Sequence, residues 1–203
     1  MRVLLCGGGT AGHVYPALAI SEIIKRNNEN AEFAYVVTKK GIENDLVKYK
    51  KYTIYARGVK KKSLTSNIRT LVITLKAIKR SKEIIKKFKP DIVIGTGGYT
   101  CFPVLYAAHK LHIKTVIHES NARPGKTTMI LSKYMDLILL NYSEAQGYFK
   151  DSMNVKVVGT PIRDSFVKYK KEQGNNNGLT ILCFGGSLGA KKINECAILI
   201  VKK

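Results

Sequence analysis

A glycine-rich turn near the start of the chain restricts the possible folds more than any other feature. A short apolar run at residues 2–6 leads into GGGTAGH at residues 7–13, and apolar residues at helical spacing follow from Val14. The apolar run predicts a buried strand, and the periodic stretch predicts a helix. Glycines let backbone N–H groups approach a ligand at a helix N-terminus, so we expect an anion or a polar sugar to bind here. A tight turn without a ligand is the alternative.

The same order of strand, turn and helix repeats along the chain. This alternation predicts an α/β fold with a doubly wound parallel sheet. Helices are expected at residues 42–47, 67–88 and 102–111 in addition to the one after the first turn. The predicted strands occupy residues 2–6, 32–37, 52–56, 91–94, 115–118, 137–140 and 155–158.

A polar, glycine-containing stretch at residues 172–178 interrupts this alternation. We therefore expect a first domain at residues 1–165 and a linker at residues 166–178. A strand, a glycine turn and a helix then restart within residues 179–203, with the strand at 179–184 and the helix from about Ala190. One strand and one helix bury too little surface to stand alone. They are expected to be the truncated start of a second α/β domain.

The net charge of +21 is unusually high for 203 residues. Such an excess favours a polyanionic partner: nucleic acid, an anionic membrane surface or a phosphorylated substrate. Lysines spread over a solvated surface are the alternative. No apolar run approaches the ~18–20 residues of a membrane-spanning helix, and the start lacks a secretory signal, so we expect a cytosolic protein. The four cysteines lack metal-binding spacing and are expected to be reduced.

Five glycine-rich or polar segments follow predicted strands. They are residues 7–13, 95–99, 118–121, 158–163 and 185–189. Ligands of open parallel sheets bind beyond the carboxyl ends of the strands, so these segments predict a cleft along one edge.

The first turn fits the dinucleotide pattern G-x-G-x-x-G at residues 7–12, but this pattern alone does not identify a dinucleotide site. The second predicted strand ends in Thr38-Lys39-Lys40, without the acidic residue that would bind a ribose. An NADP-type site could use Lys39 or Lys40, but it would leave His13 and the later turns unexplained. A Walker A sequence is also absent. The ligand is therefore expected to be a different phosphate- or sugar-containing molecule.

Five motifs carry a resemblance to a known family. They are GGTAGHVYPA at 8–17, KPDIVIGTGGY at 89–99, HESN at 118–121, VGTPIR at 158–163 and FGGSLGA at 184–190. In this order they resemble the MurG family of N-acetylglucosaminyltransferases. The resemblance implies a GT-B fold of two Rossmann-like domains. It also implies inverting transfer of N-acetylglucosamine from UDP-N-acetylglucosamine to the muramoyl 4-hydroxyl of lipid I, giving lipid II in peptidoglycan synthesis.

The chain departs from the family pattern at several positions. The family usually has Gly, Gln, Asn and Gln where this chain has Ala11, Ser120, Thr160 and Leu188. The methyl group of Ala11 is expected to crowd a ligand slightly. Most of the family's second domain, which holds the uracil and ribose of the donor, is missing. The resemblance therefore implies a fragment whose own activity is open.

The resemblance also implies the roles of individual residues. His13 is the candidate base that takes the acceptor proton, since the unperturbed pKa of histidine, about 6.5, suits that task; an imidazole that only orients substrate is the alternative. For Glu119, the alternative is a carboxylate that caps its loop or holds His118. No Asp-x-Asp pair is present, so neither a metal nor another cofactor is expected. The implied donor-binding residues are Thr10, Ala11, Gly12, Asn121, Arg163 and Ser187. The implied acceptor-diphosphate residues are Gly8, Gly9, Gly97, Gly98, Tyr99 and Glu119.

Lipid I is bound to the membrane, so the resemblance implies a peripheral enzyme on the cytoplasmic side of the cell membrane. The long predicted helix is rich in Lys and Arg and contains one acid, Glu83. Basic residues beside an apolar strip favour attachment to an anionic surface, with a solvated basic face as the alternative. The strip expected to form core is Ile68, Leu71, Val72, Leu75 and Ile78. The expected membrane-facing residues are Ile73, Lys76, Arg80 and Lys87, beside Ala77 and Ile84.

Two other functions stay open at this stage. The chain could be a non-catalytic fragment that binds lipid I or the membrane, or it could belong to another GT-B enzyme such as a sugar-nucleotide epimerase. A nucleic-acid partner is not expected, because RRM, KH and zinc signatures are absent and aromatic residues are not interleaved with the basic helix.

Overall fold

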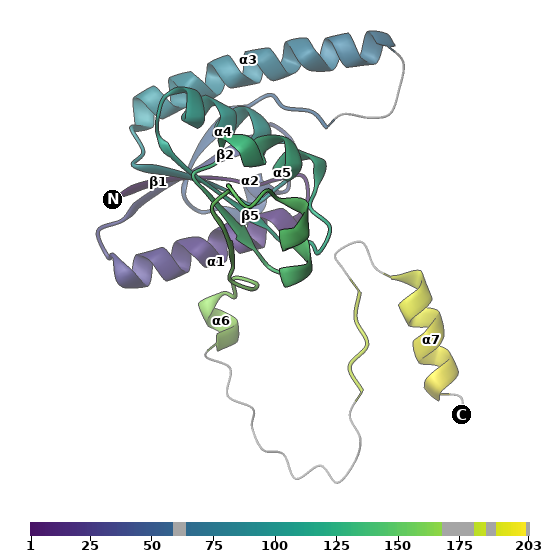
Figure 1. The fold of residues 1–203 in the computed structure, drawn as a ribbon. Coiled ribbons are helices and arrows are strands. Elements are labelled where there is room, and N and C mark those ends of the chain that lie inside the picture. Colours follow the sequence, from purple (N-terminus) through teal and green to yellow (C-terminus); the bar gives the residue numbers. More distant parts are fainter. Residues whose placement is uncertain (59–63, 168–180, 186–189, 202–203) are drawn as a thin grey trace. The chain divides into compact units, whose positions relative to one another are not determined.

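The computed structural model describes residues 1–58, 64–167, 181–185 and 190–201, shown as coloured ribbon in Figure 1. The chain divides into two units, residues 1–167 and residues 168–203, and each is described by itself. The elements of the first unit are β1 (Arg2–Cys6), α1 (Ala11–Asn27), β2 (Glu32–Thr38), α2 (Glu43–Leu46), β3 (Lys50–Ile54), α3 (Leu64–Phe88), β4 (Ile92–Gly95), α4 (Cys101–Lys110), β5 (Lys114–Glu119), α5 (Lys126–Leu131), the 3-10 helix η1 (Ser132–Tyr134), β6 (Leu137–Leu140), the 3-10 helix η2 (Ser143–Tyr148), β7 (Val155–Val157) and α6 (Asp164–Val167).

A seven-stranded sheet in the order β3-β2-β1-β4-β5-β6-β7 forms the centre of the first unit. Every neighbouring pair of strands is parallel. The order reverses between β1 and β4, which makes this pair the switch point where ligands of doubly wound sheets bind. The predicted α/β fold is confirmed for this unit, including all seven strands. Only the ends differ: β3 begins two residues before its predicted start, where Lys50 pairs with Ala34 of β2.

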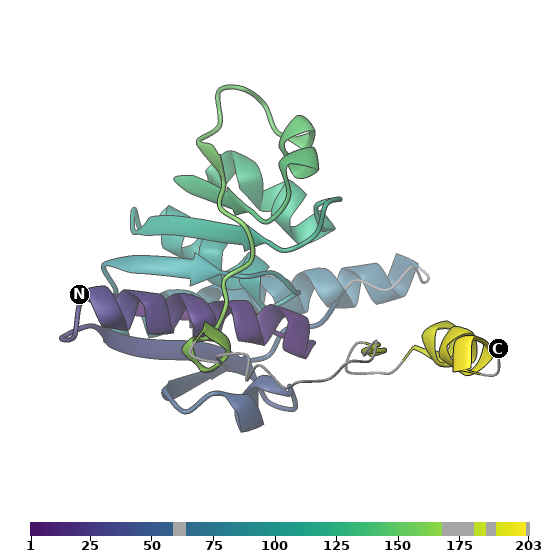
Figure 2. The same ribbon diagram turned by 90° about the horizontal axis from the view of Figure 1, so that it is seen from below.

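The side chains of β1 alternate between two cores, one on each face of the sheet. Val3 and Leu5 pack in one core with Val14 of α1, and Leu4 and Cys6 pack in the other with residues of α3 and α4. Figure 1 shows α1 on one side of the strands and α3 and α4 on the other. Seen from below in Figure 2, α1 runs alongside the strands. Burial on both faces explains why the predicted strands are apolar runs rather than alternating ones.

The long helix α3 packs on the sheet with the face opposite to the one expected. Ala77 and Ile84 are buried, at 2% exposure each, whereas Leu71 and Leu75 are 60% and 57% exposed. The prediction that Leu71, Val72 and Leu75 belong to the core is therefore wrong, since Val72 is also exposed. Both strips have helical spacing and differ only by a rotation about the helix axis, so the periodicity could not choose between them.

The expected membrane-facing residues on α3 must be revised for the same reason. Lys76, Arg80 and Lys87 are exposed, as a membrane face requires. Ile73, however, is half-buried, and the buried Ala77 and Ile84 beside it cannot touch lipid. The expected core residue Ile78 does pack, half-buried, against the core formed with α4, whereas the side chain of Ile68 lies outside the described residues.

In the second unit, the structure describes residues 181–185 and a helix, α7 (Lys191–Val201). The helix was predicted and is confirmed. The predicted strand at residues 179–184 is wrong over residues 181–184, which have no regular structure, and residues 179 and 180 lie outside the described residues. A strand requires a hydrogen-bonded neighbour, and the described part of this unit contains no other strand. Leu182 and Phe184 are accordingly 80% and 73% exposed.

Candidate active site

Four loops at the carboxyl edge of the sheet carry most of the predicted substrate-site residues, whereas Ala11, Gly12 and His13 lie in the first turn of α1 and Glu119 ends β5. The loops follow β1, β4, β5 and β7 and comprise residues 7–10, 96–100, 120–125 and 158–163. Because all seven strands run in the same direction, the four loops lie along one edge, as the sequence predicts.

His13 lies in the first turn of α1 and is held at two points by Thr96 from the loop after β4. Its Nδ1 lies 3.1 Å from the Thr96 carbonyl oxygen, and the Thr96 hydroxyl donates to the His13 carbonyl at 2.6 Å. A carbonyl oxygen only accepts hydrogen bonds, so Nδ1 carries the proton in this contact and Nε2 keeps its lone pair. A half-buried imidazole held in that tautomer is arranged to take a proton at Nε2.

The glycine loops after β1 and β4 approach each other so closely that side chains are excluded. Gly97 and Gly98 have φ values of +104° and +82°, a region that favours glycine. A Cβ on Gly97 would lie 2.7 Å from Nδ1 of His13, and one on Gly98 would collide with the carbonyl oxygen of Gly8. The two loops therefore pack directly against each other beside the imidazole, where Gly9 is exposed, Gly98 is half-buried, and Gly8 and Gly97 are buried.

The first turn of α1 is open towards this surface. Thr10 is the N-cap residue, but its side chain makes no capping hydrogen bond, and no acidic residue lies in the first turn. Thr10 and Gly12 are exposed, whereas Ala11 is buried. Tyr99 packs against Gly9, where an added Cβ would lie 2.8 Å from the ring. Uncapped N–H groups and the positive end of the helix dipole suit a phosphate or a polar sugar.

Glu119 is a buried carboxylate whose two oxygens are both occupied by its own loop. Its Oε1 accepts from the backbone N–H and the side-chain Nδ2 of Asn121, at 3.0 and 2.7 Å. Its Oε2 accepts from the N–H of Gly125 at 2.9 Å and from the hydroxyl of Thr128 at 2.6 Å. This arrangement favours the loop-capping alternative over direct contact with an acceptor. It also fixes the amide of Asn121, whose Oδ1 can accept a hydrogen bond from a sugar hydroxyl.

Arg163 stacks between two aromatic rings at the end of the loop after β7. Its guanidinium carbon lies 4.4 Å from the ring centroid of Tyr15 and 5.2 Å from that of Phe166. Tyr15 lies near the start of α1, so the stacking brings Arg163 beside the first turn of that helix. The following residue holds the segment there, because the N–H of Asp164 donates to the carboxylate of Glu22 at 2.8 Å.

Buried polar side chains fix the loops from below. The hydroxyl of Tyr35 donates to the carbonyl oxygen of Gly7 at 2.7 Å. The thiol of Cys101 donates to the carbonyl oxygen of Gly97 at 2.9 Å. Burial raises the pKa of Tyr35 and of Cys6 well above their ordinary values. Both groups are therefore neutral, and the Tyr35 hydroxyl remains a donor.

His118 joins the loops after β5 and β7. Its Nε2 lies 3.2 Å from the carbonyl oxygen of Gly159, and its Nδ1 lies 3.4 Å from the hydroxyl of Ser120. Burial lowers the pKa of His118, so the ring is neutral and Nε2 is the donor to the carbonyl.

Thr96 and Tyr35 had no role predicted from the sequence. For Thr96, the only sequence signal of a role was its position between two glycines.

One predicted donor-binding residue, Ser187, lies outside the described residues. Among those that the structure describes, no group of three or more His, Cys, Asp or Glu side chains is arranged to hold a metal ion. Within the same part of the chain, none of the helices combines the length and the apolarity that a membrane crossing requires.

Residues 3–140 match the model of the glycosyltransferase family 28 N-terminal domain. The chain belongs to this family. Among its relatives is the UDP-N-acetylglucosamine–N-acetylmuramyl-(pentapeptide) pyrophosphoryl-undecaprenol N-acetylglucosamine transferase of Alkaliphilus oremlandii, which is 42% identical over 212 residues. That alignment covers 100% of this chain and 58% of the relative. The corresponding Bacillus licheniformis protein is 44% identical over 207 residues, covering 98% of this chain and 56% of the relative. The chain thus spans less than two thirds of the length of these family 28 proteins.

Solved structures agree with the family assignment. A crystal structure of MurG from Acinetobacter baumannii matches with a TM-score of 0.64 and 29% identity, covering 76% of this chain and 44% of that one. The resemblance to MurG and the GT-B type of the α/β fold are thereby confirmed. A UDP-GlcNAc 2-epimerase from Neisseria meningitidis matches with a TM-score of 0.58 but only 17% identity, covering 79% of this chain and 47% of that one. That likeness extends to the fold alone.

Proposed function

We propose that this family 28 chain takes part in the transfer of N-acetylglucosamine from UDP-N-acetylglucosamine to lipid I in peptidoglycan synthesis. The relatives at 42% and 44% identity are named for this reaction. The observation that carries the proposal is the imidazole of His13, whose Nδ1 is bound to the Thr96 carbonyl beside two glycine loops. A sugar hydroxyl that attacks an anomeric carbon needs a base to remove its proton, and an imidazole held in this tautomer suits that role.

In this mechanism, Nε2 of His13 takes the proton of the muramoyl 4-hydroxyl. The hydroxyl oxygen forms a bond to the anomeric carbon of N-acetylglucosamine from the side opposite the phosphate, so the configuration inverts. The bond from that carbon to the β-phosphate oxygen of UDP breaks, and its electron pair leaves with UDP. Thr96 supports this step because its carbonyl stabilises the imidazolium that forms.

The remaining site residues bind the two substrates. Backbone N–H groups around Gly8, Gly9, Gly97 and Gly98 hold the acceptor diphosphate in place of a metal, with Tyr99 closing one side. The donor is bound by Thr10, Ala11, Gly12, Asn121, Arg163 and Ser187. Glu119 does not touch the acceptor in this proposal. It positions Asn121 through the two hydrogen bonds from that residue to its Oε1.

A transferase assay tests this function directly. UDP-N-acetylglucosamine and a lipid I analogue are incubated with the 203-residue chain and with a form extended through a full second domain. His13→Ala in the active form should lower kcat by about 10²–10⁴-fold with little change in KM for the donor. His109→Ala, on the far end of α4, is the matched control and should leave both constants unchanged. Failure of the extended form to transfer the sugar would refute the function, and an unchanged kcat in His13→Ala would refute the base.

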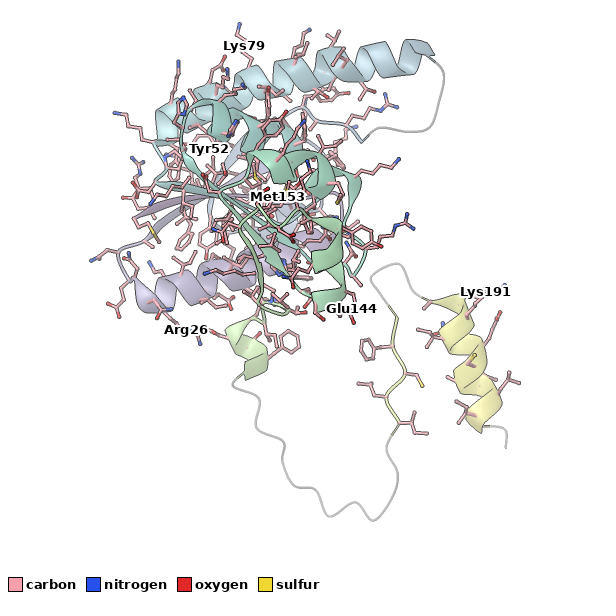
Figure 3. All side chains as sticks on the ribbon, in the orientation of Figure 1. Arg26, Tyr52, Lys79, Glu144, Met153 and Lys191 are labelled. Atoms are coloured by element: carbon pink, nitrogen blue, oxygen red, sulfur yellow. The ribbon has the colours of Figure 1, made fainter. Side chains whose placement is uncertain are left out.

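We further propose that α3 attaches the protein peripherally to the cytoplasmic side of an anionic membrane. The exposed apolar residues Leu71, Val72 and Leu75 lie beside the exposed Lys76 and Lys79. We call these five residues the α3 outer face. Lys79 projects away from the body of the unit in Figure 3. Apolar side chains that enter the interface and cations that meet anionic headgroups act together in such attachment.

Vesicle co-sedimentation tests the attachment. Charge reversal of Lys76 and Lys79 together should weaken binding to vesicles rich in phosphatidylglycerol by about 30-fold or more, at about 1 kcal/mol for each cation. Lys25→Glu, on α1 at the other face of the sheet, is the control and should change binding far less. Losses in proportion to the number of charges reversed in each protein would mean that net charge, rather than α3, determines the binding.

A further inference from the structure

An apolar groove of about 730 Å³ opens beside the glycine loops, between α3, α4 and α5. Its apolar lining includes Leu71, Tyr99, Phe102, Pro103 and Ile130. The volume falls within the range of small-molecule sites, which are mostly apolar with a few polar groups. The mechanism proposed above leaves this groove without a role.

The inner end of the groove meets the loops that are proposed to bind the acceptor diphosphate. Tyr99 belongs to both, because its ring packs against Gly9 and also lines the groove. Arg57 and Lys126 line the groove as well. Cations in the lining of an apolar channel complement a ligand that has an anionic head and an apolar body.

The outer end of the groove continues onto the α3 outer face. Leu71 lines the groove and is 60% exposed, and Ile130 on α5 lines it and is 54% exposed. Leu71 is also adjacent to Val72 on the α3 outer face. Apolar surface therefore runs from the glycine loops, through the groove, to the surface proposed to meet the membrane. Contiguous exposed apolar surface of this kind marks an interaction site.

We propose that the groove binds the prenyl chain of a polyprenyl diphosphate acceptor, beginning with the isoprene units next to the diphosphate. The inference rests on the proposed function, because it assigns a place to the lipid part of that acceptor. The diphosphate lies on the glycine loops, the first isoprene units pass Tyr99 and fill the groove, and the rest of the chain leaves along the α3 outer face into the bilayer. The enzyme thus binds the reactive head of the acceptor while most of its lipid stays in the membrane.

Binding in solution tests the groove without a membrane. The affinities of the 203-residue chain for inorganic pyrophosphate, geranyl diphosphate and farnesyl diphosphate are compared by calorimetry. If the groove holds the prenyl chain, affinity rises with chain length, and farnesyl diphosphate binds at least tenfold more tightly than pyrophosphate. Equal affinities of pyrophosphate and farnesyl diphosphate would overturn the inference. They would not affect the proposed sugar transfer, which the transferase assay tests separately. If none of the three binds, the acceptor site itself fails, and the inference fails with it.

Charged substitutions on two neighbouring residues of α5 provide a matched pair. Ile130 lines the groove, whereas Met129 does not, and both side chains are partly exposed. Ile130→Asp should reduce the ratio of farnesyl diphosphate to pyrophosphate affinity at least fivefold, and Leu71→Asp should do the same from the opposite wall. Met129→Asp should leave the ratio unchanged. A new negative charge that repels the diphosphate lowers both affinities alike, so it cancels in this ratio. An equal fall of the ratio in all three variants would overturn the inference.

Discussion

Replacing Glu119 with glutamine tests how the loop after β5 is held. The carboxylate is 4% exposed and accepts four hydrogen bonds, from two donors on Asn121, the N–H of Gly125 and the hydroxyl of Thr128. Glutamine has nearly the same shape but only one accepting oxygen. Its NH₂ group must face one pair of donors whichever way the amide is turned.

The fall in the free energy of unfolding can be worked out from these contacts. If the NH₂ replaces Oε2, the hydroxyl of Thr128 can rotate and accept, but the N–H of Gly125 is left facing another donor. An unsatisfied buried donor costs about 1–3 kcal/mol, and the bonds that lose their charged acceptor weaken as well. We therefore expect the free energy of unfolding to fall by about 2–4 kcal/mol. At about 2–4 °C per kcal/mol for a domain of this size, Tm falls by roughly 4–16 °C.

Urea and thermal unfolding followed by circular dichroism provide the measurement. Glu144→Gln is the control, since Glu144 is exposed on η2 and is labelled in Figure 3. The control should lie within about 0.5 kcal/mol of the unsubstituted chain. If Glu119→Gln is equally mild, the carboxylate does not hold the loop, and its role as an acceptor-binding residue becomes the better interpretation.

Three further substitutions test other parts of the site. Thr96→Val removes the 2.6 Å hydrogen bond to the His13 carbonyl; it should lower stability by about 1–2 kcal/mol and reduce kcat in the transferase assay more than it raises KM. Gly98→Ala places a side chain at φ +82° against the loop after β1 and should cost about 2–4 kcal/mol in urea unfolding, whereas Gly147→Ala, with open space around it, should be neutral. Because burial lowers the pKa of His118 in the folded chain, stability should be full above about pH 6.5, the unfolded value, and fall below it by up to about 1.4 kcal/mol per pH unit. His118→Asn should remove that part of the pH dependence, and an unchanged slope would exclude His118 as its source.

The sequence was sufficient to predict the sheet and the loops at its edge. Each strand of the first unit is a short apolar run, because both faces of the sheet are covered by helices. Each ligand-facing loop carries glycine or polar residues directly after such a run, and parallel pairing then brings these loops to one edge. The strands and loops depend on which residue types follow one another, and their common edge follows from parallel pairing. Both can therefore be predicted from the sequence alone.

The contacts between the loops could not be predicted in this way. The hydrogen bonds between His13 and Thr96 join residues 83 positions apart. Neither a histidine nor a threonine indicates from its type alone which residue it will contact. Glu119 was assigned to acceptor binding because the resemblance to the MurG family implies that role. Its four donors became visible only when the loop was folded. The prediction of a strand at residues 179–184 is wrong over residues 181–184 for a related reason. An apolar run forms a strand only beside another strand.

The face of α3 is the most instructive error. Two apolar strips lie on this helix, and helical spacing led us to expect the strip with leucine and valine in the core. The structure buries Ala77, Ser81 and Ile84 instead and exposes Leu71 and Leu75. Small residues let a helix approach its neighbour closely, which accounts for the buried strip. Nothing in the core of the first unit accounts for the exposed leucines. The membrane attachment proposed for α3 would cover them, and the groove that Leu71 lines also reaches Tyr99, which packs against Gly9 beside the proposed diphosphate site.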